Sequence, residues 1–538
     1  MSAGTAGAFI AAQEAPAVRS RARVGVTALT AATALCYIVF GLIRFRRFRD
    51  GTFDLVIFDQ AVRGYAHFSA PTSMARGVAD GVGTHFLVLG DHWSPILAVL
   101  APLYWIHDGP ATLIVAQALL FALAIPPLWI YTRRLLGARA AYFVCGAYAL
   151  SLPVAAAMNF DFHEVAFVPV LTAVMAERFQ ASRGKHSLHG ILAAIALLMV
   201  KEDMGLLIAG YGAYLFVIRQ RATGLSFVAG GLAATWVSTR VLIPAFGGSA
   251  NFYWAYGQFG SSVATAGWHA LTHPLETLGT LVTPQVKITT MLSLVAPFAL
   301  LPLASPMVLA AVPLLLERML ATGYPAWWTS SYHYDAFIVM VLVLAAVDGA
   351  ARVERLIQAR WPGWRIPALR IPVRAVRLRT PRLPLALAWA AAVCAAAVAV
   401  LPWSPLGQAL HPKFYTVNAR IGAAEAAVAE VPDGALTEAA DYVGPRLSGR
   451  AHVLLLDGTP RWAPWVVADT RGLDFPFCSP ADQAHLVTYL EAHGYTQVFA
   501  RDGYVVLRRP ADGRTQAALR HPAPAPRLRG NACPRYRQ

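Results

Sequence analysis

Long uncharged stretches are the feature of this sequence that most restricts its fold. About eleven apolar runs have the length of a helix that crosses a membrane. They cover residues 24–44, 110–132, 139–158, 165–180, 188–200, 204–219, 225–246, 285–303, 306–320, 333–350 and 384–402. Hydrophobic residues make up 57% of the 538 residues and charged residues only 14%, which excludes an ordinary soluble globular chain. The sequence therefore predicts an α-helical polytopic membrane protein with about eleven transmembrane helices.

Basic residues at the ends of the apolar runs predict the orientation of the chain, because loops rich in Lys and Arg stay in the cytoplasm. Three loops and the linker 352–383, which carries nine arginines, fall on the same side of the predicted bundle. The basic residues of these loops are Arg133, Arg134, Arg139, Arg183, Lys185, Arg219 and Arg221. This pattern places the N-terminus in the cytoplasm and the C-terminus outside. Four residues contradict it on the outer face, namely Arg44, Arg46, Arg47 and Arg49.

The order of apolar and polar stretches predicts four parts of the chain. They are a disordered cytoplasmic N-terminus at 1–23, a transmembrane domain at 24–403, a small extracytoplasmic α/β domain at 404–510 and a disordered tail at 511–538. The transmembrane domain contains an outer loop at 45–93 and the basic cytoplasmic linker at 352–383. In the α/β domain we expect strands at 434–437 and 452–456, a helix at 480–493 and a hairpin at 496–508.

Two further local features bear on this layout. Residues 94–106 form an apolar stretch with prolines at 95 and 102, which favours a surface or re-entrant helix over a span. Cys478 and Cys533 both fall in the predicted exported region, where a disulfide between them would be chemically permitted.

Two short polar clusters interrupt the apolar runs. FDFHE occupies residues 160–164, and KED occupies residues 201–203. The predicted topology places both on the outer face, together with the loop after the first run. Ionisable groups near a membrane are costly unless they face water, a partner or a functional cavity, so this convergence predicts a site. The candidate site residues are Asp54, Asp59, Gln60, His92, Asp161, His163, Glu164, Lys201, Glu202, Asp203, Tyr332 and His333.

Each of these groups also has a simpler structural interpretation. Asp161, with Glu164 three residues later, has the spacing of a helix capping box. KED would serve equally as a salt-bridged turn at the membrane surface. Asp54 would serve as a solvated loop acid. Asp161, His163 and Glu164 are also weak candidates for metal ligands, because their spacing matches no established ligand pattern.

Four motifs that occur in a fixed order point to a known family. They are FDLVIFDQAVRGY from residue 53, GDHWSPILAVLAPLY from residue 90, NFDFHEVAFVP from residue 159 and LLMVKEDMGL from residue 197. Over roughly residues 40–500 the sequence resembles the bacterial membrane proteins of domain-of-unknown-function family 2079. The layout of that family is similar to the glycosyltransferase C (GT-C) superfamily. The resemblance implies a multi-pass protein of the bacterial plasma membrane.

The GT-C resemblance also implies an activity. It implies the transfer of a sugar from a polyprenyl-phosphate donor to a cell-envelope acceptor on the outer face of the membrane. Asp54 or Asp59 would occupy the place of the acidic residue in the first outer loop, where a carboxylate can act as general base toward the acceptor hydroxyl. The other candidates would bind the substrate. Membrane lipid is an expected partner, a divalent cation is a candidate cofactor, and no nucleic-acid partner is expected.

Two other classes of function compete with this hypothesis. One is a transporter or lipid flippase that uses the same acids and histidines to relay protons. The other is a non-enzymatic membrane-anchored scaffold of the cell envelope. Transporters of this kind often contain internal repeats and a site near the membrane midplane. This sequence shows no convincing repeat and gathers its charges near one face, which favours the enzyme.

Overall fold

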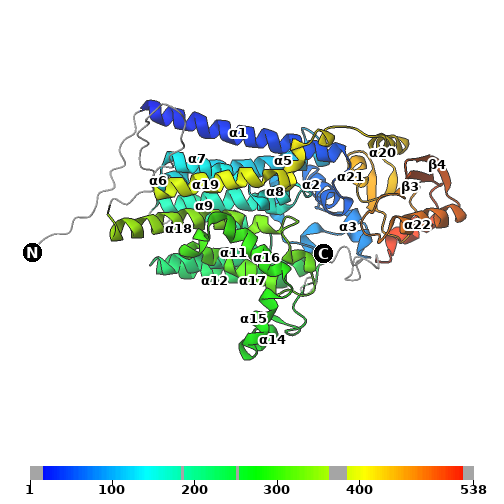
Figure 1. Ribbon diagram of the computed structural model, residues 1–538. Coiled ribbons are helices and arrows are strands. Elements are labelled where there is room, and N and C mark those ends of the chain that lie inside the picture. The colour runs from blue at the N-terminus through cyan, green and yellow to red at the C-terminus, as the bar shows by residue number, and fades with distance from the viewer. Residues whose placement is uncertain (1–15, 183–186, 250–253, 363–383, 525–538) are drawn as a thin grey trace, which may run out of the picture.

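A bundle of helices with a small β-sheet at one end forms the protein. The computed structural model describes residues 16–182, 187–249, 254–362 and 384–524. The long helices lie roughly parallel, and the strands with their covering helices lie beyond one end of the bundle, here called the sheet end (Figure 1). Most of the basic linker and the extreme termini fall outside the described residues.

All eleven predicted apolar runs lie in helical segments. The main helices are α1 (Pro16–Arg46), α5 (Pro110–Leu123), α6 (Ile125–Leu136), α7 (Ala138–Ala149), α8 (Leu152–Met158), α9 (Phe167–Ala181), α10 (Leu188–Leu198), α11 (Met204–Val217), α12 (Arg221–Val237), α16 (Val286–Val295), α17 (Val312–Leu320), α18 (Val339–Arg360) and α19 (Leu385–Val400). Because α1 begins at Pro16, the predicted disordered N-terminus 1–23 is wrong in its last residues.

Fewer helices than the predicted eleven have both the length and the composition of a membrane span. Among the described residues, four helical segments are long and apolar enough to cross a membrane: Ala22–Arg46, Pro110–Leu136, Arg221–Ala245 and Leu385–Trp403. They become five if α7 and α8, bent by 44° relative to each other, form one span. Helices such as α10 have only 11 residues, which is short for a crossing. The predicted count of eleven is therefore not confirmed.

Helix α18 forms the centre of the bundle. Every residue from Val339 to Ala351 is buried, which accounts for the uninterrupted apolar run in this part of the sequence. Asp348 is the one charged residue in this buried stretch. Its carboxylate accepts a hydrogen bond from Ser305 and pairs with Arg352 one turn later. A buried carboxylate is tolerated here because it has these partners.

The segment between α1 and α5 consists of short helical turns. A π-helix (Thr52–Val56) leads into α2 (Ile57–Ala66), and α3 (Met74–Ala79) follows. Pro95–Leu100 forms a 3-10 helix that continues into α4 (Ala101–Tyr104). This last segment is too short for a conventional span, in line with the predicted surface or re-entrant helix.

A mixed five-stranded sheet occupies the C-terminal part of the chain. Its strands are β1 (Leu436–Ala439), β2 (His452–Leu455), β3 (Trp465–Asp469), β4 (Thr496–Arg501) and β5 (Tyr504–Arg508), in the order β2-β1-β3-β5-β4. Strand β1 is parallel to both of its neighbours, whereas β5 is antiparallel to β3 and β4. Helices α20 (Ala419–Glu430), α21 (Gly444–Leu447) and α22 (Pro480–Ala492) accompany the sheet.

Sequence patterns identified most of this region but missed three elements. The structure adds β3 and α20, and it places α23 (Gly513–Arg520) in the tail that was predicted to be disordered. Helix α23 forms because Asp512 caps it and Thr515 donates a hydrogen bond to the carbonyl of Trp462. Cys478 is part of a disulfide, while Cys533, with which the sequence permits it to pair, lies outside the described residues.

Candidate functional site

Backbone contacts from two distant parts of the chain fix the loop that carries Asp54. The Gly51 N–H donates to both carboxylate oxygens of Asp161, at 3.0 Å each. The Thr52 N–H and hydroxyl donate to the Asp441 carbonyl at 2.7 Å, and the Phe53 N–H donates to the Asp441 carboxylate at 2.9 Å. The π-helix that presents Asp54 is therefore held by both FDFHE and the segment after β1.

Asp54 is a partly exposed carboxylate in contact with a buried imidazole. Its side chain is 30% exposed, and Oδ1 lies 3.4 Å from Nε2 of His163, whose side chain is 8% exposed. This distance is slightly long for a hydrogen bond, and such contacts in unliganded sites often shorten when substrate binds. The pair can exchange a proton with a group that approaches the exposed side of Asp54.

The two ring nitrogens of His163 both face oxygen atoms. Nδ1 lies 3.2 Å from the Asp161 carbonyl, which can only accept, so this nitrogen carries a proton. Nε2 then faces Asp54, and the contact is attractive only when the pair holds one further proton. The ring is fixed in place because it stacks on Phe160 and His333, with centroid distances of 5.4 and 3.7 Å.

Tyr332 and His333 join this site from the loop before α18. His333 stacks on His163, and Tyr332 packs edge-on against Phe160 at 5.2 Å. The loop is held by Arg318 of α17, which pairs with Asp335 at 2.8 Å. The predicted convergence of FDFHE with this loop is therefore present in the structure.

The capping-box interpretation of FDFHE is wrong. The Asp161 carboxylate accepts from Gly51, far away in the sequence, and caps no helix. Glu164 pairs instead with Lys201, at 3.1 Å between Oε1 and Nζ. Both carboxylates are buried, so each contributes to contacts between segments of the chain.

KED is also more than a local turn, because its members contact other segments. Besides the Lys201–Glu164 pair, Glu202 accepts a hydrogen bond from the Trp93 N–H and lies 2.8 Å from Nδ1 of His92. Burial lowers the pKa of Lys201, but the carboxylates around it raise that pKa overall, so the ammonium stays charged. Burial raises the pKa of Asp203 to about 7.

Two predicted site residues serve a different purpose. Asp59 is completely buried and is bonded to Arg63, Tyr104 and Ser448. Gln60 donates to the carbonyl of Val453 and accepts from the Ser73 hydroxyl and the Ala75 N–H. Both side chains attach α2 to neighbouring segments, including the sheet region, and neither contacts Asp54 or His163.

The weak metal candidates do not form a common ligand set. Asp161, His163 and Glu164 contact three different partners, Gly51, Asp54 and Lys201. Among the residues that the structure describes, no group of three or more His, Cys, Asp or Glu side chains is arranged to hold a metal ion.

Sequence reasoning missed the acids that surround Gly51. Asp50 forms a side-chain hydrogen bond with Asp161, and the Asp441 carboxylate also lies close to Gly51. A Cβ atom added to Gly51 would lie only 2.8 Å from an Asp441 oxygen and 3.1 Å from an Asp161 oxygen, so a larger residue there would displace these carboxylates. The one available signal for Asp441 was its place just after β1, at the carboxyl end of a parallel strand.

These acids predict an unusual dependence of stability on pH. Burial raises the pKa of Asp50 to about 6 and that of Asp441 to about 7. The folded state therefore binds protons more tightly than the unfolded state, and the free energy of unfolding falls as pH rises from about 4 to about 7. The expected slope is at most ~1.4 kcal/mol per pH unit for each titrating group.

Melting curves of the detergent-solubilised protein between pH 5 and pH 8 test this. The melting temperature should fall toward pH 8, and the fall should be smaller in Asp441→Asn, which keeps an oxygen acceptor for Phe53 but no longer titrates. A melting temperature that rises with pH, equally in both proteins, would contradict the assignment.

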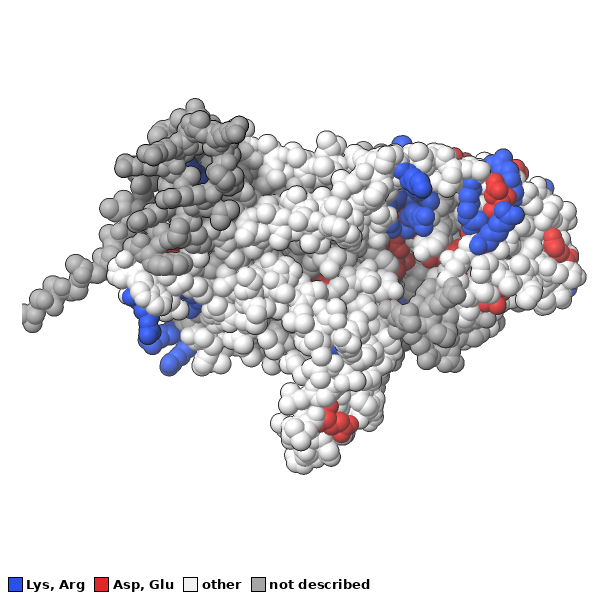
Figure 2. All heavy atoms as spheres, in the orientation of Figure 1, with Lys and Arg blue, Asp and Glu red and all other residues white. Residues whose placement is uncertain are grey.

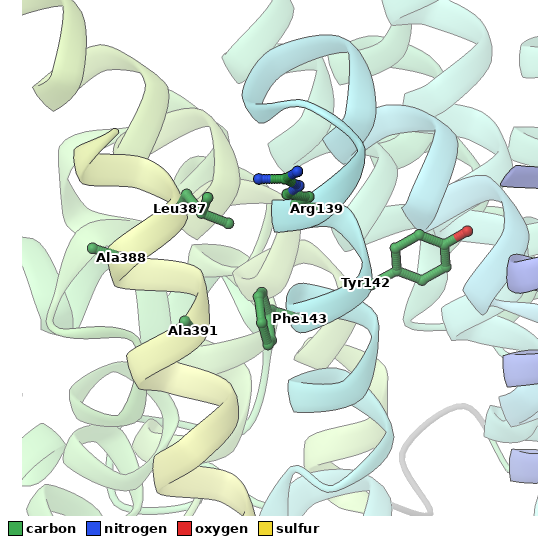
Figure 3. Close-up of a pocket in the computed structure, with 6 residues that line it drawn as sticks. All are labelled: Arg139, Tyr142, Phe143, Leu387, Ala388 and Ala391. Carbon is green, nitrogen blue, oxygen red and sulfur yellow. The ribbon is translucent and has the colours of Figure 1, made fainter. Parts of the chain in front are cut away.

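An apolar groove elsewhere in the bundle takes no part in this site. It lies between α7 and α19 and is lined by Arg139, Tyr142, Phe143, Leu387, Ala388 and Ala391 (Figure 3). These residues belong to the first two turns of the two helices, which begin at the end of the bundle opposite the sheet end (Figure 1).

Comparisons with known proteins bear on the family and the fold. The family model described as predicted membrane protein (DUF2079) matches residues 44–506. No curated protein matches the sequence.

Several solved structures show a distant likeness. ArnT from Cupriavidus metallidurans bound to undecaprenyl phosphate is 13% identical, with a TM-score of 0.45 over 91% of this chain and 98% of that chain. Its apo form gives a TM-score of 0.46 at 13% identity, over 91% and 100%. The archaeal oligosaccharyltransferase AglB from Archaeoglobus fulgidus, in complex with an inhibitory peptide and a dolichol-phosphate, gives 0.43 at 10% identity, over 91% and 77%.

Proposed function

The chain belongs to the DUF2079 family of predicted membrane proteins, and from this premise we propose that it is a membrane glycosyltransferase. It would move a sugar from a polyprenyl-phosphate donor to a hydroxyl acceptor at the sheet end of the bundle. The similarity of the family's layout to the GT-C superfamily suggests this reaction class, and the geometry around Asp54 is compatible with a general base there.

The observation that carries the proposal is the Asp54–His163 pair. Asp54 is a partly exposed carboxylate, and the backbone just before it is hydrogen-bonded to Asp161 and Asp441. Asp59, in contrast, is buried and hydrogen-bonded to neighbouring side chains. A fixed, accessible carboxylate can remove the proton of an acceptor hydroxyl as its oxygen attacks the anomeric carbon. His163 would supply or share the proton that keeps this carboxylate in its reactive geometry.

The leaving phosphate needs cations, and the structure suggests which ones. Lys201 is already paired with Glu164, and Arg47 donates to three backbone carbonyls of the segment after α19. Arg46 and Arg49 have exposed side chains at the sheet end. Figure 2 shows basic side chains beside acidic ones near the junction between the bundle and the sheet. We therefore assign the lipid phosphate to Arg46 and Arg49, through charge-assisted hydrogen bonds.

A reconstituted assay tests the reaction class. The full-length protein in lipid vesicles is given a panel of radiolabelled polyprenyl-phosphate sugars together with an extract of envelope acceptors. Radiolabel that becomes covalently attached to an acceptor, with release of polyprenyl phosphate, supports the transferase. Movement of the labelled lipid across the vesicle without covalent product would establish a flippase instead. An absence of both, together with loss of a bound envelope partner on deletion of residues after 404, would favour the scaffold.

A further inference from the structure

We propose that the helical hairpin formed by α14 and α15 is a lipid-embedded arm that lies in the membrane beside the bundle. Helix α14 spans Val263–Thr272 and α15 spans Pro274–Val282, and together they project sideways from the bundle (Figure 1). Neither helix contains a buried residue. The inference is independent of the proposed reaction.

The hairpin exposes large apolar side chains on both helices, and its one acid, Glu276, is paired. His269 Nε2 lies 3.2 Å from Oε2 of Glu276, whose side chain is 55% exposed, and the rings of His269 and His273 stack at 4.4 Å. The large apolar side chains point outward. Their exposed fractions are 70% for Trp268, 78% for Leu271, 83% for Leu275 and 58% for Leu278. Water would disfavour this arrangement, whereas lipid favours it.

Helical spacing confirms that these side chains share faces. Trp268 and Leu271 are three residues apart on α14, and Leu275 and Leu278 are three apart on α15. Glu276 is the only Asp, Glu, Lys or Arg between Ser262 and Thr283. Figure 2 accordingly shows the projecting arm as uncharged surface with a single acidic spot. The lack of basic residues argues for contact with the apolar and interfacial part of the lipid, rather than with anionic headgroups alone.

The base of the arm is held rigidly against α17. Lys287 of α16 donates to the carbonyl of Thr280 in α15 at 2.8 Å and to that of Met319 in α17 at 2.6 Å. Gln258, in the segment that leads into α14, donates to the Leu320 carbonyl at 2.9 Å. The outward direction of the arm is therefore fixed by the fold and does not depend on a flexible tether.

The lipid-facing surface of the bundle continues onto the arm. The segment Arg221–Ala245, which contains α12, is long and apolar enough to cross a membrane, and only 17% of its apolar window is buried. It exposes Leu232 and Trp236 at 51% and 61%. Helix α11 packs on α12 and also on α17, and α17 holds α15. Lipid that surrounds α12 is thus the nearest apolar environment for Trp268 and its neighbours.

Fluorescence of Trp268 in the full-length protein tests the location of the arm. The protein has fourteen tryptophans, so the signal of Trp268 is obtained as the emission of the wild type minus that of Trp268→Phe. In phosphatidylcholine vesicles, this difference emission should be blue-shifted relative to tryptophan in water. When the phosphatidylcholine is brominated near the headgroup end of the acyl chain, bromine should quench most of this emission. The matched control is Trp462→Phe, because Trp462 packs on Tyr489 and His493 beside the sheet, and its difference emission should not respond to bromine.

Two results would overturn the proposal. Quenching of Trp268 by aqueous iodide, with no effect of brominated lipid, would place the arm in water. Protection from both quenchers, with exposure of Trp268 on dilution of the protein in the membrane, would show that a second copy covers the arm. Leu275→Cys labelled with an environment-sensitive dye gives an independent reading of the same three outcomes, since Leu275 is the most exposed of the four side chains.

Discussion

The Asp54→Asn variant is expected to lose sugar transfer by a factor of about 10²–10⁴ while folding normally. Asparagine has nearly the same size as aspartate but cannot accept the proton of an acceptor hydroxyl at neutral pH. The side chain is partly exposed and its backbone is held by Asp161 and Asp441, so the loop should keep its position. Initial rates with the radiolabelled donor, together with the melting temperature of each protein, provide the measurement.

Asp59→Asn is the matched control, because the same chemical change is made five residues away in a buried carboxylate. Asp59 is bonded to Arg63, Tyr104 and Ser448, so its neutralisation should lower the free energy of unfolding by ~1–3 kcal/mol. Transfer should then fall only as far as the folded fraction falls. Full activity in Asp54→Asn, or a loss of activity in Asp59→Asn without a change in melting temperature, would reverse the two roles.

The sequence could not separate these two acids, and the reason is physical. Asp54 and Asp59 lie in the same motif with similar apolar neighbours, so hydropathy treats them alike. Their difference arises from Ser448, which lies 389 residues from Asp59 and reaches it only in the folded protein. Local patterns predict helices and strands because these depend on near neighbours, whereas contacts at such separation depend on the complete fold.

The difference between local patterns and long-range contacts also explains which features of the site could be predicted from the sequence. That FDFHE, KED and the 332–333 loop meet at one end of the bundle followed from counting apolar runs, and the Lys201–Glu164 and His163–His333 contacts agree with it. The role of Asp161 did not follow, because its spacing to Glu164 matches a local capping pattern that the folded chain does not use. The Gly51 N–H is its partner instead.

Two of the four arginines after the first apolar run have partners within the protein. Arg44 is buried, donates to Asn159 and the Arg49 carbonyl, and lies 3.6 Å from Asp50. Arg47 binds three carbonyls between residues 413 and 416. These two side chains hold protein segments together, so they have a structural function besides any effect on orientation. Counts of basic residues near a span treat such bonded arginines as if they were solvated.

Replacing Arg318 by methionine is expected to be strongly destabilising, because it leaves a buried carboxylate without its partner. Arg318 is only 5% exposed, and its guanidinium pairs with Asp335 at 2.8 Å while donating to the carbonyls of Trp327, Thr329 and Tyr334. Asp335 is fully buried. Breaking a buried pair from one side typically costs about 3–5 kcal/mol, so the melting temperature should fall by several degrees and the protein should be recovered in lower yield.

The double variant Arg318→Met with Asp335→Leu separates charge from packing. Removal of both charges eliminates the unpaired carboxylate, so part of the lost stability should return, although the three carbonyls remain without their donor. Arg471→Met is the control, because Arg471 and Asp502 are exposed and 3.9 Å apart, and its effect should stay below about 1 kcal/mol. Arg318 holds the loop before α18, and this loop carries His333, which stacks on His163. The single variant Arg318→Met should therefore also lose transfer activity. Equal stability of the single and double variants would show that the carbonyl contacts, and not the ion pair, hold this loop against the site.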